Sequence, residues 1–179
     1  KNAALPLLAA SILCKEGEMT YTNVPWLRDT AAILHILEYL GAETSYDDGT
    51  VRIRTDKLVS KPLPRELVST LRASIVLLGP LLARFGEAEM AYPGGDVIGK
   101  RPVQAHISAF QQMGAEDLCT SDMLKLRGTL KPGHLILPEF SVTATENALL
   151  AAALLPGETR IDLAAAEPHV QDCAKLVQS

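Results

Sequence analysis

Aromatic side chains and net positive charge are both scarce in this chain of 179 residues. Tyr, Phe and Trp together make up 4% of it, and the formal net charge at neutral pH is −4. Nucleic-acid-binding proteins combine clustered cations with aromatic rings on which bases stack, and the chain has no such interleaving. We therefore expect no nucleic-acid partner, and any anionic ligand must be held by a few local cations.

Cysteine is also sparse, and Cys14, Cys119 and Cys173 lie far apart with no CxxC pair among them. An odd number of widely spaced cysteines disfavours both a disulfide framework and a zinc site. It is typical of reduced thiols in a cytoplasmic protein. The four histidines share no ligand-like spacing, so we expect them to be structural or exposed. The sequence thus predicts a cytoplasmic location, no metal and no cofactor.

Long apolar runs are absent as well. The longest reach only about ten residues, too few for a helix that crosses a bilayer, and no signal peptide is apparent after Lys1. No membrane partner is expected. With 47% hydrophobic and 21% charged residues, the composition is that of one ordinary globular domain, which we place at residues 1–179.

The dipeptide Gly-Glu occurs three times, each time after an apolar run. Its positions are 17–18, 86–87 and 157–158, at intervals of 69 and 71 residues. The preceding runs are apolar nearly all round, as expected for helices buried on every side. They span Ala3–Leu13, Ile75–Phe85 and Asn147–Leu155. Asn2 can cap the first of these helices, and Arg72 and Glu146 open the other two.

Each Gly-Glu is followed by a strand-like run and then by a second helix. The strand-like runs are Met19–Val24, Ala88–Tyr92 and Thr159–Leu163. The second helix ends at Gly41 in the first unit and at Gly114 in the next, because glycine suits the left-handed turn after a helix. In the first unit two short strands follow, at Glu43–Tyr46 and Thr50–Thr55.

The chain therefore consists of units of helix, strand, helix, strand, strand, with an incoming strand expected before each first helix. We place the repeats at approximately residues 1–60, 61–133 and 134–179. The third repeat stops before its strand pair, so we expect the chain to be a piece of a longer protein.

The stretch Pro93–Pro102, which reads PGGDVIGKRP, departs from this regular plan. Gly17 and Gly41 of the first unit are 24 positions apart, whereas Gly86 and Gly114 of the second are 28 apart, and the four extra residues fall here. Glycines let the backbone approach a small anion, Lys100 and Arg101 can neutralise it, and Asp96 can move a proton. A plain glycine-rich turn with a solvated basic end is the alternative.

This stretch resembles the catalytic loop of the UDP-N-acetylglucosamine enolpyruvyl transferases. Their loop reads PGG, usually Cys, an apolar pair, Gly and a basic residue before Arg-Pro. Further segments fit the family in order along the whole chain: Lys1–Pro6, Leu71–Ile75, Leu82–Gly86 and Ser141-Val142. The resemblance implies an α/β (α+β) fold, an inside-out α/β barrel domain built from βαβαββ repeats. Its buried helices lie inside and its sheets outside.

The resemblance also implies a reaction. The family transfers the enolpyruvyl group of phosphoenolpyruvate to the 3′-hydroxyl of UDP-N-acetylglucosamine and releases phosphate, which is the first committed step of peptidoglycan synthesis. That step supports cell wall biogenesis, cell shape and cell division. In the family a second domain, which cannot be matched here, completes the site with a base and another arginine. We therefore expect this chain alone to be inactive.

Three residues are implied to be catalytic. Arg101 matches a bidentate ligand of phosphoenolpyruvate, and Lys1 matches a lysine that contacts the same substrate. Asp96 stands where the family usually has a cysteine that protonates the methylene carbon. Fosfomycin alkylates that cysteine, so we expect resistance to it, because a carboxylate is a poorer nucleophile than a thiolate. A frayed terminus is the alternative for Lys1, and a surface arginine for Arg101.

The remaining implied contacts concern the nucleotide sugar. Asn2 matches a residue that meets the sugar, and Arg72 matches one against substrate phosphate, with a helix cap and a structural ion pair as the respective alternatives. The segments that match the uridine-lining part of the family site are Pro102, Val103, Gln104 and Ala105, and Glu139, Phe140, Ser141 and Val142.

Three positions depart from the family pattern. Gln104 replaces a commonly acidic residue, Glu139 a frequent lysine, and Val76 a common tryptophan. Separately, Thr143-x-x-Glu146 has the pattern of a capping box that opens the third buried helix. Two rival functions remain: a non-catalytic binding or scaffold domain of the same fold, and a transferase like enolpyruvylshikimate phosphate synthase, which should lack this loop.

Overall fold

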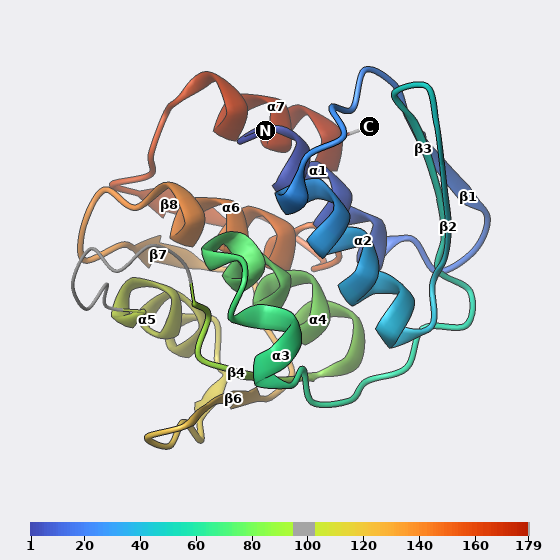
Figure 1. Ribbon diagram of the computed structural model, residues 1–179. Coiled ribbons are helices and arrows are strands. Elements are labelled where there is room, and N and C mark those ends of the chain that lie inside the picture. Colours follow the sequence, from blue (N-terminus) through green and yellow to red (C-terminus); the bar gives the residue numbers. More distant parts are fainter. Residues whose placement is uncertain (95–102, 179) are drawn as a thin grey trace.

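The computed structural model describes residues 1–94 and 103–178, and the chain forms three consecutive units around a common helical centre (Figure 1). The first unit begins with α1 (Ala4–Ala10), which continues as the 3₁₀ turn η1 (Ser11–Leu13). It goes on through β1 (Glu18–Tyr21), α2 (Arg28–Leu40), β2 (Glu43–Asp47) and β3 (Thr50–Arg54).

The second unit follows the same order after a short helix, α3 (Arg65–Val68). Its inner helix starts as the 3₁₀ segment η2 (Arg72–Leu77) and continues as α4 (Leu78–Phe85). The remaining elements are β4 (Glu87–Ala91), α5 (Gln104–Gln112), β5 (Glu116–Asp117) and β6 (Met123–Arg127). The incoming strand expected before the inner helix is reduced to one parallel bridge, between Leu63 and Met90.

The third unit contains β7 (His134–Ile136), α6 (Val142–Ala152), β8 (Arg160–Asp162) and α7 (Pro168–Val177). Here the incoming strand is present, because β7 pairs with β8 in parallel. A parallel pair needs a crossover connection, and α6 supplies it. The inner helix begins earlier than the predicted run Asn147–Leu155 and ends at Ala152, so the last residues of that run lie beyond the helix.

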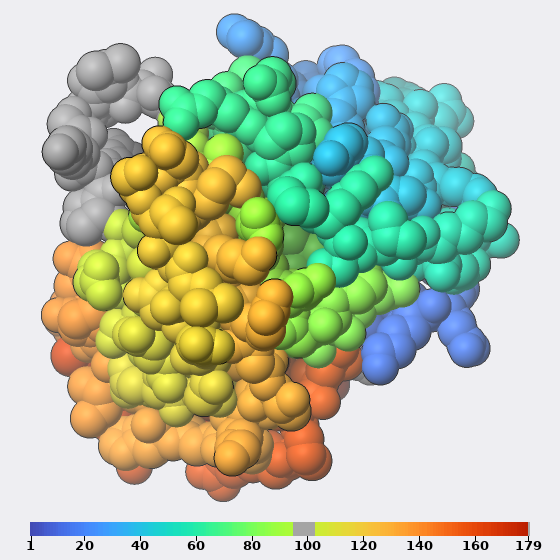
Figure 2. Space-filling model, turned by 90° about the horizontal axis from the view of Figure 1, so that it is seen from below, coloured from blue at the N-terminus to red at the C-terminus, as the bar shows by residue number. Residues whose placement is uncertain are grey.

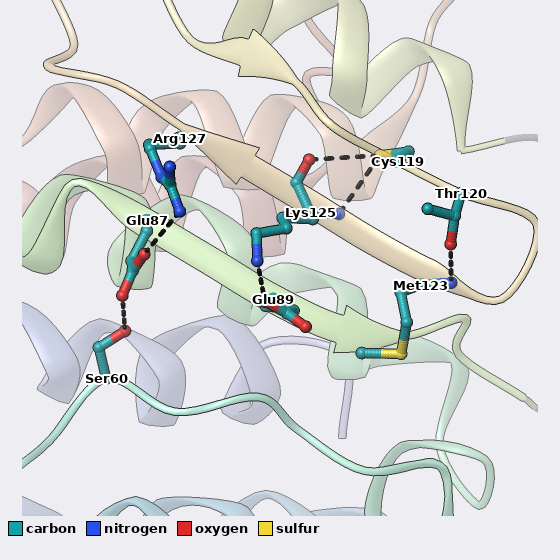
Figure 3. Close-up of polar contacts among 8 residues, drawn as sticks. All are labelled: Ser60, Glu87, Glu89, Cys119, Thr120, Met123, Lys125 and Arg127. Carbon is teal, nitrogen blue, oxygen red and sulfur yellow. Dashed lines mark hydrogen bonds and ion pairs between the residues drawn. The ribbon is translucent and has the colours of Figure 1, made fainter.

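The sheets of the first two units have identical wiring. The strand orders are β1-β3-β2 and β4-β6-β5, and every pair is antiparallel. The glutamate of each Gly-Glu dipeptide has an arginine as its cross-strand partner in both sheets. Glu18 pairs with Arg54, and Glu87 pairs with Arg127. Figure 3 shows the second pair, 3.8 Å apart, beside a tighter contact of 2.6 Å between Lys125 and Glu89.

The three inner helices lie at the centre of the core, to which α2, α5 and the inward side chains of the strands also contribute, and the sheets lie outside them (Figure 1). Figure 2, which looks from below, shows the yellow residues of the second unit, around residue 120, on the surface of the molecule. The buried side chains of the inner helices are small or aliphatic, as the all-round apolar runs predict. They include Leu8, Ala9, Leu78, Leu82, Ala148 and Leu150.

Helix ends follow the predicted glycines. Gly41 follows α2 with φ 107°, and Gly114 comes two residues after α5 with φ 96°, both in the left-handed region. A side chain at Gly41 would in addition place Cβ 2.7 Å from the backbone oxygen of Lys57. The prediction that glycine ends these helices is confirmed.

Arg84 joins the second unit to the first. Its guanidinium, in the last turn of α4, donates to the backbone oxygens of Ile12, Cys14 and Thr55, each at 2.8 Å. The first two oxygens lie at the end of η1, where a helix leaves carbonyl groups without intrahelical partners. Arg84 thus caps the inner helix of the neighbouring unit.

Within the described ranges, none of the helices has the length and apolar character needed to cross a membrane.

Candidate functional site

The loop with the predicted proton donor leaves the described part of the chain at Gly94. The backbone N–H of Gly94 donates to the Val68 oxygen at 3.2 Å, and a Cβ at Gly94 would lie 1.7 Å from the Ser69 oxygen. The first glycine of the motif is therefore required by its close approach to the end of α3. Three predicted site residues, Asp96, Arg101 and Pro102, lie outside the described residues, as does Lys100.

The chain re-enters the described part directly at the start of α5. Val103 precedes the helix with non-helical backbone angles and makes no side-chain cap. Gln104 is exposed, whereas Ala105 is buried. Of these three predicted nucleotide contacts, Gln104 presents its side chain to solvent, and Ala105 can contribute only backbone groups.

The start of α6 holds the second predicted nucleotide segment. Glu139 and Phe140 are exposed, Phe140 to 75% of its surface, and Ser141 and Val142 are half-buried. The Phe140 side chain is therefore accessible to a ligand.

The predicted capping box at Thr143 and Glu146 is wrong. The cap is Ser141, whose hydroxyl accepts from the Ala144 N–H at 3.4 Å and whose backbone oxygen accepts from the Thr145 hydroxyl at 2.8 Å. The helix therefore begins at Val142, and its cap lies two residues before Thr143. Glu146 lies inside it rather than opening it.

Glu146 is instead a buried acid. It is 2% exposed, and its Oε1 has no hydrogen-bond partner among the described residues. In α7, the imidazole Nε2 of His169 lies 4.0 Å from that oxygen. Burial, followed by the charge of Glu167, raises the pKa of Glu146 to about 7. The same desolvation, with the charge of Glu146, raises the pKa of Cys173 to about 12.

Arg72 begins η2 and is half-buried, at the start of the second inner helix as predicted. It lies close enough to His106 of α5 for its positive charge to disfavour protonation there. Burial is the larger cause, and the two together lower the pKa of His106 to about 3. The starts of η2 and α5 are therefore neighbours.

His106 also links α5 to α6. Its Nε2 lies 3.1 Å from the Thr143 hydroxyl and its Nδ1 lies 2.8 Å from Nδ2 of Asn147. Asn147 in turn donates to the Ile75 oxygen at 2.8 Å and accepts from the Gly79 N–H at 2.7 Å. This polar network, which the sequence did not reveal, connects the starts of three helices that carry predicted substrate contacts.

Lys1 forms an ion pair with Asp29, in the first turn of α2. An acidic side chain in the first turn is also stabilised by the positive end of the helix dipole. Asn2 does not cap α1, because the cap position is Ala3 and no side chain bonds the helix start. Asp29 was not anticipated. The backbone of Leu27 is extended just before α2, which places Asp29 in the first turn of the helix.

Among the described residues, no three His, Cys, Asp or Glu side chains are grouped as they would be around a metal ion. What the site offers is three adjoining helix starts, a cation at the beginning of η2 and another at the chain's first residue. Such an arrangement favours anionic ligands.

The chain belongs to the EPSP synthase (3-phosphoshikimate 1-carboxyvinyltransferase) family, whose model matches residues 1–179. It is more specifically similar to proteins named UDP-N-acetylglucosamine 1-carboxyvinyltransferase. It shares 49% identity over 180 residues with that of Shewanella woodyi and 47% over 179 residues with that of Psychromonas ingrahamii. These matches cover 99% of this chain but 43% and 42% of the relatives. The chain thus spans about two fifths of their length.

Solved structures agree on the fold. The enolpyruvyl transferase NikO from Streptomyces tendae matches with a TM-score of 0.83 and 22% identity, over 99% of this chain and 42% of that one. EPSP synthase from Acinetobacter baumannii matches with a TM-score of 0.69 and 22% identity, over 92% and 40%. The predicted fold class, that of the enolpyruvyl transferases, is confirmed.

Proposed function

We propose that this chain is the catalytic-loop domain of an enzyme that transfers the enolpyruvyl group of phosphoenolpyruvate to the 3′-hydroxyl of UDP-N-acetylglucosamine, with release of phosphate. The observation that carries the proposal is the identity of 45 to 49% with proteins of that name, spread over the whole chain. The adjoining helix starts, each with an expected substrate contact, add physical support.

The proposed roles follow the charges that the reaction moves. Arg101 and Lys1 hold phosphoenolpyruvate, and the ion pair with Asp29 keeps the ammonium group of Lys1 in place until the substrate competes for it. Arg72 lies against a substrate phosphate. Asp96 protonates the methylene carbon. Preorganised cations of this kind stabilise charge best where water is excluded.

The nucleotide part is proposed to lie along the starts of α5 and α6. Asn2 meets the sugar. The other contacts proposed for the uridine nucleotide are Pro102, Val103, Gln104, Ala105, Glu139, Phe140, Ser141 and Val142. Phe140 offers the largest exposed apolar surface among them. Glu139 and Gln104 influence how the nucleotide is recognised, because neither side chain can offer a positive charge to its phosphates.

A second domain is proposed to complete the site with the base for the sugar hydroxyl. In the cell we place the enzyme in the cytoplasm, at the first committed step of peptidoglycan synthesis. It would there support cell wall biogenesis, cell shape and cell division. The carboxylate of Asp96 in place of a thiolate is proposed to confer resistance to fosfomycin.

The test is a chimaera in which residues 1–179 replace the matching segment of the Shewanella woodyi relative. We expect the folded chimaera to release phosphate from phosphoenolpyruvate only when UDP-N-acetylglucosamine is present, and residues 1–179 alone to turn over negligibly. A folded but inactive chimaera, or one active only with shikimate 3-phosphate, would contradict the proposal. Binding of the nucleotide sugar without phosphate release would favour the non-catalytic alternative.

A further inference from the structure

We propose that His106 is a positioning residue of the nucleotide site, acting through hydrogen bonds that fix the starts of α5 and α6 relative to η2. The proposal rests on the proposed function, since it concerns how that site is held. His106 itself is buried and is not proposed to touch substrate or to carry a proton.

The orientation of the network is fixed by its one unambiguous donor. The backbone N–H of Gly79 can only donate, so the atom of Asn147 that faces it at 2.7 Å is the amide oxygen. The amide nitrogen of Asn147 then faces both the Ile75 oxygen and Nδ1 of His106, at 2.8 Å each. Nδ1 must therefore accept, and the imidazole proton is on Nε2.

The second ring nitrogen extends the chain of bonds to α6. Nε2–H of His106 donates to the Thr143 hydroxyl oxygen at 3.1 Å. Every polar atom of the neutral ring is satisfied in this tautomer, whereas a protonated ring would place an N–H against the Asn147 amide hydrogens. The positive charge of Arg72 nearby disfavours protonation further. The ring is thus a neutral link with one defined direction.

What the link joins is the reason for the proposal. Thr143 lies two residues after Ser141, His106 two residues after Gln104, and Ile75 three residues after Arg72. These three helix starts carry most of the proposed contacts that the structure describes. Because satisfied buried networks rigidify their surroundings, loss of the link should loosen the mutual placement of the contacts.

The experiment uses the chimaera described above with Thr143→Val, which is the milder change, and His106→Leu. Thr143→Val leaves Nε2–H without an acceptor, and His106→Leu removes both links. We expect KM for UDP-N-acetylglucosamine to rise about tenfold in each variant, with kcat changed less than about twofold. This pattern is expected because the lost interactions stabilise the bound substrate and the transition state equally.

Conservative variants provide a rescue. The amide oxygen of His106→Asn can replace Nδ1 toward Asn147, and the amide nitrogen of His106→Gln can replace Nε2 toward Thr143. We expect each to restore KM in part, and neither to match the wild type.

The matched control is Arg84→Leu, which removes three partly buried hydrogen bonds at the opposite ends of the inner helices. It should lower the melting temperature and leave KM unchanged. An equal rise in KM for Arg84→Leu would overturn the proposal, since general destabilisation would then suffice. Unchanged KM in folded Thr143→Val or His106→Leu would overturn it while leaving the proposed function intact. An inactive wild-type chimaera would overturn both.

A direct measurement on residues 1–179 is also decisive. Nitrogen-15 NMR of the His106 ring should show the proton on Nε2 throughout the neutral pH range. A proton on Nδ1 would contradict the direction of the link.

Discussion

The first and second units share strand order and the facing glutamate–arginine pairs, yet they fill the same helical positions differently. Eight residues before the closing glycine of the second helix, the first unit has the fully buried Ile33 and the second has His106. Seven residues before the Gly-Glu glycine, the first unit has the buried Ala10 and the second has Gly79. The common apolar positions build the scaffold, and the exceptions mark where the second unit is adapted to its site.

The third unit extends the comparison. Asn147 lies ten residues before its Gly-Glu glycine, and the corresponding position of the second unit is the buried Val76. Gly79 and Asn147 therefore depart from the repeat together. The absence of a side chain at Gly79 leaves the space that the backbone of Asn147 occupies.

The largest expected effect concerns the loop that only the second unit has. In the chimaera, Asp96→Asn should lower kcat by roughly 10²–10⁴-fold, because an amide cannot supply the proton. Steady-state phosphate release measures the change. Asp48→Asn, in the hairpin turn of the first unit, is the matched control and should keep normal turnover. Near-normal turnover in Asp96→Asn would contradict the proposed role of Asp96 as the proton donor, and with it the chemical distinction between the two units.

The next effect tests the difference between Gly79 and Ala10. Gly79→Ala would bring Cβ to 2.4 Å from the Asn147 backbone oxygen, so the helices must separate. We expect the free energy of unfolding to fall by about 3 kcal/mol. Denaturant titration of residues 1–179 measures this. Gly133→Ala, where a Cβ meets nothing within 4 Å, should change it little. Equal effects would mean that the close approach of α4 and α6 is unimportant.

A smaller effect concerns Glu146, which stands where the second unit has the buried Ile75. The fold keeps this carboxyl protonated up to about pH 7, whereas the unfolded chain loses the proton near its ordinary pKa of 4.5. The folded state therefore binds more protons in this window, and the free energy of unfolding falls as pH rises through it.

Glu146→Gln should abolish that part of the pH dependence. Between pH 4 and pH 8 the variant should lose less free energy of unfolding than the wild type, by on the order of 2 kcal/mol. Denaturant titrations at both pH values measure the change. The exposed Glu158→Gln is the control and should leave the pH dependence in place. An identical pH dependence in Glu146→Gln would show that its burial costs nothing.

Local signals predicted much of this fold. Gly41 marked the end of α2, because a glycine that ends a helix acts on its immediate neighbours in the chain. The hairpin of β2 and β3 followed from alternation around a glycine-containing turn. The choice between Ser141 and Thr143 as the cap of α6 was not decided locally, since both residues can cap. In the fold the hydroxyl of Thr143 is hydrogen-bonded to His106, so Ser141 is the residue that caps the helix.

The candidate site was predictable only where it coincides with a motif. Arg72 and Ser141 were found through the resemblance, but the link between His106 and Asn147 spans 41 positions in sequence. The ion pair of Lys1 with Asp29 likewise joins two segments that only folding brings together. Aligning the repeats would have flagged His106 and Asn147, because each replaces an apolar residue of another unit.

The guanidinium of Arg84 has a consequence for how the molecule comes apart. It supplies donors from the second unit to three carbonyl groups of the first, so the end of the first inner helix is complete only while the second unit is folded. Repeat proteins whose modules touch only through apolar faces can lose them one after another. Here adjacent modules share a cap, and heat or denaturant should melt the first two in a single cooperative transition.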